Sequence, residues 1–249
     1  IQAHHLAHVL GLKDYLDRRQ LRKFGFRFFW SDGAPDITQV TELGASTFLP
    51  TPSYQLDRGM LENDLAGMVQ ALGVQHLDGA LVRDFTLGRK GARHQVRYER
   101  GGTTQEVSAD WLVDASGRAG LVKRRLDLAQ PNDHTAHAVW FRIDRRIDVA
   151  DWTQDAGWRD RCNPPNRWLS TNHLVGAGYW VWLIPLASGS HSVGIVADPA
   201  LHPLESINSF DKAMDWLRTY QPRLFDALDG KRHQLQDFAF FRKFSYGCK

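Results

Sequence analysis

The stretch "GYWVWLIPLASGSHSVGIVADP", Gly178 to Pro199, constrains the fold of this chain more than any other segment. Two apolar runs flank Ser188-Gly189, a pair of residues typical of tight turns. We therefore predict a β-hairpin closed by a two-residue turn. A lone hairpin is marginally stable in water, so further strands must pair with it and the chain must contain a larger sheet.

The predicted turn also fixes which residues face each other across the hairpin. The expected partners are Ala197 for Trp180, Ile195 for Trp182, Val193 for Ile184 and Gly194 for Leu183. Because side chains alternate along a strand, Trp180, Trp182 and Ile184 share one face. Two interpretations of this face are open. Residue type alone favours an ordinary buried core, whereas the pairing of two indoles also suits a rigid wall beside a reactive group.

Size and composition exclude several classes of protein. The chain has 249 residues, of which 43% are hydrophobic and 24% charged, as expected for one large or two modest globular domains. Its 31 basic and 28 acidic residues are interspersed, which argues against nucleic-acid binding. No apolar run approaches the roughly 20 residues that a membrane helix needs, so we expect no membrane association.

The cysteines and histidines suggest neither a disulfide framework nor a metal site. Cys162 and Cys248 lie far apart and form no C-x-x-C motif. The 11 histidines show no spacing typical of ligands, and His173, although a possible catalytic residue, is more easily explained as structural. The N-terminus lacks the features of a signal peptide, so we expect a cytoplasmic protein.

Periodicity predicts an α+β fold. The predicted helices are residues 4–21 with a break at Gly11, residues 58–74 with Asp57 as N-cap, and residues 210–220 with Ser209 as N-cap. The predicted strands are residues 23–30, 79–88, 94–100, 103–109, 111–114, 137–144, 167–173, 179–186, 191–198 and 237–245. The three strands from 79 to 109 form a β-meander, and 111–114 is expected to be a short buried strand. Strands dominate after residue 134, which favours an antiparallel sheet.

Alternation within "KFGFRFFW" predicts two faces for the first strand. Lys23, Gly25 and Arg27 lie on one face, and the aromatic residues Phe24, Phe26, Phe28 and Trp30 lie on the other.

The string W-x-W-x-I-P stands unbroken at Trp180, Trp182, Ile184 and Pro185, and it resembles the signature of the flavin-dependent halogenases, the tryptophan halogenases and their relatives. In that family the tryptophans are thought to keep the organic substrate away from the flavin, so that the oxidant meets a halide ion instead. The resemblance therefore favours the wall over the ordinary core face and assigns these four residues to the catalytic centre.

A second resemblance concerns Lys23. "KFGFRF" is similar to the K-x-x-x-[KR]-F pattern around the halogenase lysine, with Arg27 in the second basic position. That lysine lies between flavin and substrate and passes on the hypohalous species, and the resemblance gives Lys23 this role. Burial lowers the pKa of a lysine and favours the neutral amine. The alternative is a solvated lysine at the start of a strand.

Two further motifs resemble FAD-contacting elements of the same monooxygenase and halogenase superfamily. The turn "DASGR" comprises Asp114, Ala115, Ser116, Gly117 and Arg118, and its small residues suit close approach of the backbone to a cofactor. "YQLDRGMLENDL" is similar to Q-x-x-R-x-x-L-[DE]-x-x-L, which would place Gln55 and Arg58 near the flavin or its phosphates. A helix-start cap and a surface arginine explain these residues equally well.

The resemblance implies residues 54–130 as part of an FAD-binding domain of the GR2 type, Rossmann-like and containing the β-meander. It implies residues 1–53 and 131–249 as the mostly antiparallel substrate side. The N-terminal G-x-G-x-x-G unit of the family and its later G-W-x-L-x-G-D-A motif do not occur in the sequence, so we expect an interior portion of such a protein.

The implied activity is an FAD-dependent halogenase. A separate flavin reductase supplies reduced FAD, and O₂ and halide give a hypohalous species for an electron-rich, small-molecule substrate. Two alternatives remain: an FAD monooxygenase or oxidoreductase without halide chemistry, and a non-catalytic fragment.

Overall fold

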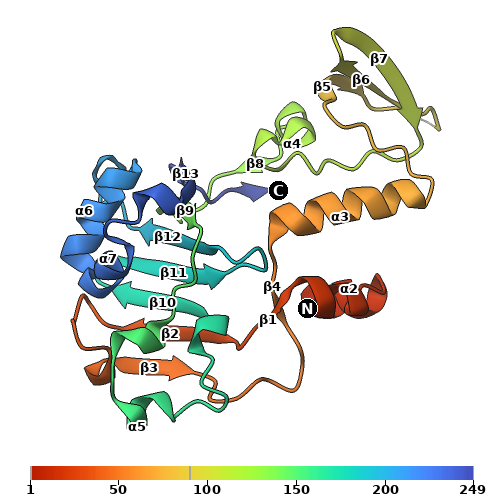
Figure 1. Cartoon of the computed structure of the whole chain (residues 1–249). Coiled ribbons are helices and arrows are strands. Elements are labelled where there is room, and N and C mark those ends of the chain that lie inside the picture. Colours follow the sequence, from red (N-terminus) through yellow and green to blue (C-terminus); the bar gives the residue numbers. More distant parts are fainter. Residues whose placement is uncertain (1, 90, 249) are drawn as a thin grey trace. The chain divides into compact units, whose positions relative to one another are not determined.

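The computed structural model describes residues 2–89 and 91–248, and the chain divides into two compact units (Figure 1). Unit 1 comprises residues 1–61 and 132–245, and unit 2 comprises residues 62–131 and 246–249. The predicted boundary at residue 54 precedes helix α3, Arg58–Ala71, whereas the two units divide inside that helix.

Unit 1 is built on a seven-stranded sheet with the order β13-β9-β12-β11-β10-β2-β3. Its strands are β2 Phe26–Trp30, β3 Thr41–Gly44, β9 His137–Ile143, β10 Thr171–Gly176, β11 Tyr179–Pro185, β12 His191–Ala197 and β13 Leu235–Phe241. Only the β10–β2 pair is parallel, and all other neighbours are antiparallel. The predicted α+β class with a mostly antiparallel sheet is therefore confirmed.

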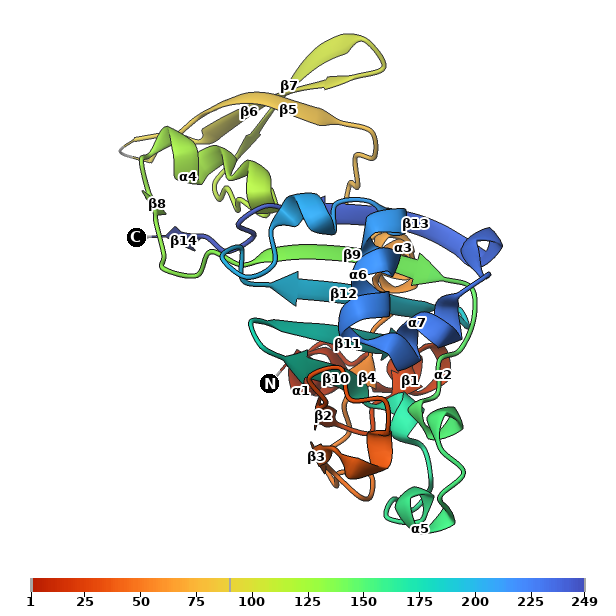
Figure 2. The same cartoon turned by 90° about the vertical axis from the view of Figure 1, so that its left-hand side faces the viewer.

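One face of this sheet is the hydrophobic core. Along β11 the odd-numbered residues are buried and the even-numbered ones are half-buried, so the odd-numbered side chains face inward. Helices α6, Phe210–Tyr220, and α7, Pro222–Leu228, cover the inward face, as Figure 2 shows. Ser209 accepts a hydrogen bond from the Lys212 backbone N–H and caps α6, as predicted.

Unit 1 contains further helices and strands besides its 3₁₀ turns. They are α1 Gln2–His4, a π-helical turn His5–Val9, α2 Lys13–Arg19, α5 Ala156–Arg159 and the two-stranded pair of β1 Leu21–Arg22 with β4 Tyr54–Gln55. Gly11 adopts φ +67° between the first two helices, where the sequence predicts a break.

Unit 2 contains the predicted β-meander. Strands β5 Leu81–Thr86, β6 His94–Arg100 and β7 Thr103–Ala109 form an antiparallel sheet in sequence order. Helix α4, Leu121–Arg125, follows, and β8 Ala129–Gln130 pairs with β14 Gly247–Cys248.

The predicted strand at 111–114 is wrong. This segment is irregular, and the side chains of Trp111 and Val113 are 86% and 83% exposed. A strand needs a neighbour for its backbone groups, and no described segment pairs with this one. The prediction at 167–173 is right only in part, because Arg167–Leu169 is a 3₁₀ turn and β10 begins at Thr171.

The predicted register of the tryptophan hairpin is also wrong, by one residue. Trp182 lies opposite Gly194 and Trp180 opposite Val196. The loop is one residue longer than expected, because the N–H of Leu186 donates to the carbonyl of Ser190 at 2.9 Å. Gly189 adopts φ +92°, the left-handed position of a three-residue loop with a bulge.

The predicted alternation from Lys23 to Trp30 holds only from Phe26 onward. Phe26, Phe28 and Trp30 share one face, as predicted, but Phe24 is completely buried elsewhere. Gly25, at φ +109°, interrupts the extended backbone, so residues 23–25 are not part of the strand.

A buried ionic triad fixes the position of β2 from its core side. The carboxylate of Glu42 on β3 accepts hydrogen bonds from Arg27 on β2 and from Arg167, whose Nε lies 2.8 Å away. The side chains of Arg27 and Arg167 are only 2% and 1% exposed. Arg167 also lies over the Trp158 ring, with its guanidinium carbon 3.8 Å from the ring centroid.

Candidate functional site

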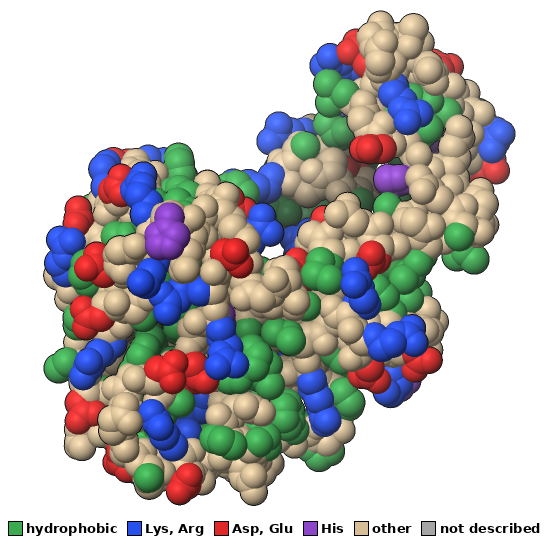
Figure 3. Space-filling view, in the orientation of Figure 1, with side chains coloured by type: hydrophobic (Ala, Val, Ile, Leu, Met, Phe, Trp, Pro, Cys, Tyr) green, Lys and Arg blue, Asp and Glu red, His purple; other side chains and the backbone are tan. Residues whose placement is uncertain are grey.

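The sheet face opposite the core carries most of the aromatic side chains singled out by sequence. We call this the aromatic face, and it comprises Phe26, Phe28, Trp30, Trp140, His173, Trp180 and Trp182. The cross-strand register places His173 directly between Phe28 and Trp182. Figure 3 shows hydrophobic side chains gathered at the surface of unit 1, near the ends of these strands.

The four catalytic residues predicted from the tryptophan motif divide between the two sheet faces. Trp180, Trp182 and Ile184 lie together on the aromatic side and are half-buried. Pro185 is buried on the core side, at the end of β11, opposite His191. The shared face of the first three is confirmed, and it is not the core, because the buried face of β11 is the opposite one.

Lys23 enters a cavity next to this face. Its backbone N–H donates to the Ser53 carbonyl at 2.7 Å, which anchors the segment before β2. Its ammonium nitrogen lies 3.6 Å from the centroid of the Phe26 ring, a cation–π contact. The cavity has a volume of about 490 Å³ and is lined, besides Lys23, by Ala3, Leu6, Gly25, Phe26, Leu49, Ser53, Tyr54 and Leu56.

The surroundings of Lys23 make the neutral amine more accessible than it is in an exposed lysine. Burial lowers its pKa from 10.5 to about 8, and no carboxylate of the described residues forms an ion pair with it. The Tyr54 hydroxyl, which also lines the cavity, donates its hydrogen bond to Asp17 at 2.6 Å. The neutral amine is the form with a free lone pair, which nucleophilic chemistry requires.

The lowered pKa of Lys23 predicts the pH at which this side chain becomes reactive toward an acylating reagent. Acylation of Lys23 by a pulse of acetic anhydride should reach half its maximal rate near pH 8, because the neutral amine is the reactive form. At pH 7 about one Lys23 in ten is neutral, against about one in 3,000 for a lysine at the usual value. Lys13 is the control, because its hydrogen bond to Asp17 raises its pKa above 10.5. Peptide mass spectrometry that gives both lysines the same midpoint would contradict the prediction.

A row of rings runs from the Lys23 cavity to His173, and the strand register continues it toward Trp182. The Phe26 ring centroid lies 5.9 Å from that of His173, and the Phe28 ring stacks on His173 at 4.7 Å and 14°. His173 is in turn the cross-strand partner of Trp182. Burial lowers the pKa of His173 below 6.5, and the charge of Lys23 adds to this effect. The row therefore remains uncharged near neutral pH.

Sequence analysis favoured a structural role for His173, and the structure places its ring in this row. A signal was available, because His173 is the last residue of a predicted strand that precedes the tryptophan strand by one turn. Only the register, however, places His173 between Phe28 and Trp182 on neighbouring strands.

Gln55 and Arg58, both predicted to contact the cofactor, lie near the start of α3. Gln55 is buried, and both ends of its amide are engaged: its Nε2 donates to the Leu169 carbonyl at 3.1 Å, and its Oε1 accepts from Thr171 at 3.0 Å. Arg58 is exposed. The predicted N-cap position of Asp57 agrees with the start of the helix at Arg58.

The DASGR turn, residues 114–118, lies in unit 2. The carboxylate of Asp114 accepts hydrogen bonds from the backbone N–H groups of Ser116 and Val122, at 3.0 and 2.8 Å. Hydrogen bonds from Ser116 and Val122 lower the pKa of Asp114 to about 2. Gly117 adopts φ +60° with open space on its outer side, and Arg118 is exposed. Asp114, Ala115 and Ser116 also line an apolar cavity of about 270 Å³ under the turn.

Three further features of the described residues concern metal binding, membrane-spanning helices and disulfide bonds. Among residues 2–89 and 91–248, no group of three or more His, Cys, Asp or Glu side chains is arranged to hold a metal ion. Within the same residues, no helix is both long enough and apolar enough to cross a bilayer. Cys162 and Cys248 are both free thiols.

Comparison with known families decides the relationship. The family model described as tryptophan halogenase matches residues 38–238. The chain belongs to the tryptophan halogenase family. This halogenase-family chain is 27% identical over 280 aligned residues to flavin-dependent halogenase chlA of Dictyostelium discoideum. It is 24% identical over 199 residues to the 1H-pyrrole-2-carbonyl-(peptidyl-carrier protein) chlorinase of Pseudomonas fluorescens.

Solved structures of halogenases share the fold. Halogenase PltM, in complex with phloroglucinol and FAD, aligns with a TM-score of 0.75 at 16% identity, over 98% of this chain and 48% of PltM. The flavin-dependent halogenase CmlS aligns with a TM-score of 0.71 at 20% identity, over 97% of this chain and 41% of CmlS. The alignments with chlA and the chlorinase cover 100% and 79% of this chain, but only 44% and 42% of those proteins. The tryptophan halogenase family member described here thus spans less than half the length of these two curated relatives.

Proposed function

We propose that the full-length protein is an FAD-dependent halogenase that passes a hypohalous species through Lys23 to an electron-rich aromatic substrate. In the overall reaction O₂, used together with reduced FAD, takes two electrons from the halide and converts it to hypohalous acid, with water as the other product. An aromatic C–H is then replaced by a carbon–halogen bond, and water is released. Membership of the tryptophan halogenase family supports this proposal, as do the flavin-dependent halogenases among its relatives.

The observation that carries the proposal is the environment of the Lys23 amine. The amine lies in an apolar cavity, and burial lowers its pKa to about 8. One end of an uncharged row of rings lies beside it, and the row ends at His173, the cross-strand partner of Trp182 in the tryptophan motif. An amine in this position can hydrogen-bond hypohalous acid or accept its halogen, while the apolar rings exclude competing water.

The residues proposed to hold FAD fit that role to different degrees. The turn from Asp114 to Arg118 presents exposed backbone, small side chains and a guanidinium, which suits a phosphate-bearing cofactor. The amide of Gln55 has both ends bonded within unit 1, so its part is to hold β4 against β10. Bound FAD would supply the two-electron activation of O₂ that halide oxidation requires. Reduced FAD would come from a separate flavin reductase.

The proposal is tested by the mass of the product. The full-length protein is supplied with FAD, NADH, a flavin reductase and phloroglucinol, the ligand of PltM, as the aromatic probe. With bromide we expect a product that carries the bromine isotope pattern, and without halide we expect none. A hydroxylated product that forms equally with and without bromide would instead identify a monooxygenase. If neither product forms with phloroglucinol or with an acylated pyrrole probe, the halogenase proposal fails in favour of a non-catalytic protein.

A further inference from the structure

The two tryptophans of the motif are held in different ways. Trp182 lies opposite Gly194 on β12, whereas Trp180 lies opposite Val196. The indole Nε1–H of Trp182 donates to the Ser192 hydroxyl at 3.1 Å. Within the described residues the Trp180 indole forms no such hydrogen bond.

Gly194 leaves the space that the Trp182 ring fills. A Cβ atom at position 194 would lie 2.1 Å from Cζ2 and 2.3 Å from Cε2 of the indole, distances that no side chain can adopt. Nε1, Cε2 and Cζ2 are consecutive atoms along one edge of the ring. That edge therefore runs along β12 from Ser192 to Gly194, and the indole lies flat on the backbone of the strand.

Gly194 also separates two indoles. Its partner on the other side is Trp140 of β9, whose ring packs on Phe241 at a centroid distance of 4.9 Å. Gly194 thus lies between Trp182 on β11 and Trp140 on β9, and neither strand can move aside. Any side chain at position 194 would therefore lift the Trp182 indole away from the sheet.

We propose that Gly194 and Ser192 are positioning residues that keep the Trp182 indole flat on β12 and so set the depth of the space above the aromatic face. This assignment deepens the proposed function, on which its catalytic meaning rests. Trp182 is the immobile part of the wall, and Trp180 is held by packing alone. A lifted indole would disturb the wall that the proposed function assigns to the two tryptophans and allow water or substrate to reach the oxidant.

The geometry is tested without flavin chemistry, in the 249-residue protein labelled with ¹⁵N-tryptophan. Trp182→Phe assigns the Trp182 indole signal, and the largely exposed Trp111 serves as the reference for free exchange. We expect the Trp182 Nε1–H to exchange more slowly than that of Trp111. Ser192→Ala should accelerate it about fivefold, the effect of losing one hydrogen bond, and Ser192→Thr should restore it.

Gly194→Ala should shift the Trp182 signal, whereas Val196→Ala, beneath Trp180, should leave it in place. Exchange of Trp182 as fast as that of Trp111, or a Trp182 signal that neither Ser192→Ala nor Gly194→Ala alters, would overturn the proposal. If Gly194→Ala does not fold, the exchange rates of Ser192→Ala and Ser192→Thr still test the proposal.

The catalytic consequence of the proposal is tested in the full-length protein. The measured quantity is the ratio of halogenated product formed to hydrogen peroxide released. Gly194→Ala should lower this ratio several-fold while NADH consumption stays unchanged, and an unchanged ratio would overturn the positioning role. Failure of the wild type to halogenate at all would sink the proposed function but leave the indole measurements intact.

Discussion

Replacing Lys23 with alanine in the full-length protein should abolish halogenation. We expect product formation to fall by at least about 100-fold, because a positioned group that acts on the reacting species typically contributes that much or more. NADH oxidation and peroxide release should continue, since in the proposed reaction Lys23 acts after the halide has been oxidised. The fold should survive, because Lys23 has no ion pair among the described residues and its ammonium is partly desolvated.

Two variants make this result specific. Lys13→Ala removes an exposed lysine that pairs with Asp17, and it should leave halogenation unchanged. Lys23→Arg keeps the positive charge but cannot supply a neutral amine, so it should be as inactive as Lys23→Ala. Undiminished product with Lys23→Ala, measured by mass spectrometry beside the peroxide yield, would remove this residue from the mechanism.

The second large effect concerns the buried triad. Glu42→Gln leaves the guanidinium groups of Arg27 and Arg167 buried without a counter-charge, and we expect it to lower the free energy of unfolding by about 3–5 kcal/mol. Urea unfolding followed by tryptophan fluorescence measures this, because Trp158 lies directly under Arg167. The loss of stability should also loosen β2, which carries Phe26 and Phe28.

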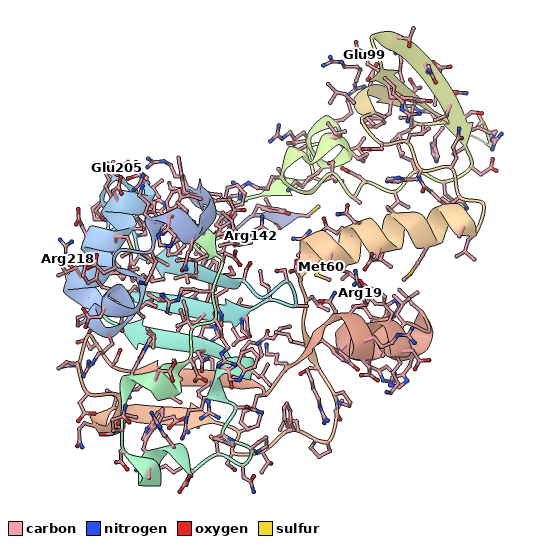
Figure 4. The ribbon with its side chains drawn as sticks, viewed as in Figure 1. Arg19, Met60, Glu99, Arg142, Glu205 and Arg218 are labelled. Atoms are coloured by element: carbon pink, nitrogen blue, oxygen red, sulfur yellow. The ribbon has the colours of Figure 1, made fainter. Side chains whose placement is uncertain are left out.

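An exposed ion pair provides the matched control. Arg142, labelled in Figure 4, donates to Asp237 at 2.9 Å, and both side chains are more than 40% exposed. Asp237→Asn makes the same chemical change as Glu42→Gln at a solvated site, so it should cost no more than about 1 kcal/mol. An equal decrease in the free energy of unfolding for the two variants would show that the buried triad stabilises the fold no more than an exposed ion pair does.

The regular elements of this chain could largely be predicted from its sequence. The meander, the capped helix at Phe210 and the shared face of Trp180 and Trp182 follow from periodicity and capping, which are local properties. The register of the hairpin does not, because one extra loop residue around Gly189 shifts every partner.

The candidate site could be predicted from the sequence only in part. The motif resemblance selects Lys23, but the cavity around it is formed by segments as distant as Leu6 and Leu56. The Glu42–Arg167 ion pair joins residues 125 positions apart, and no local sequence pattern predicts such a pair. Trp111 shows the opposite limit, because an apolar run read as a buried strand remains exposed without a neighbour to pair with it.

The alternation along β11 has a practical consequence for enzyme engineering. Substitutions at positions 180 and 184 should reshape the aromatic face with less effect on folding than substitutions in the core, because these side chains lie on the half-buried side of β11. Positions 181 and 183 should be kept fixed, since Val181 and Leu183 are completely buried. Selection for new substrates and selection for stability therefore act on interleaved residues of one strand.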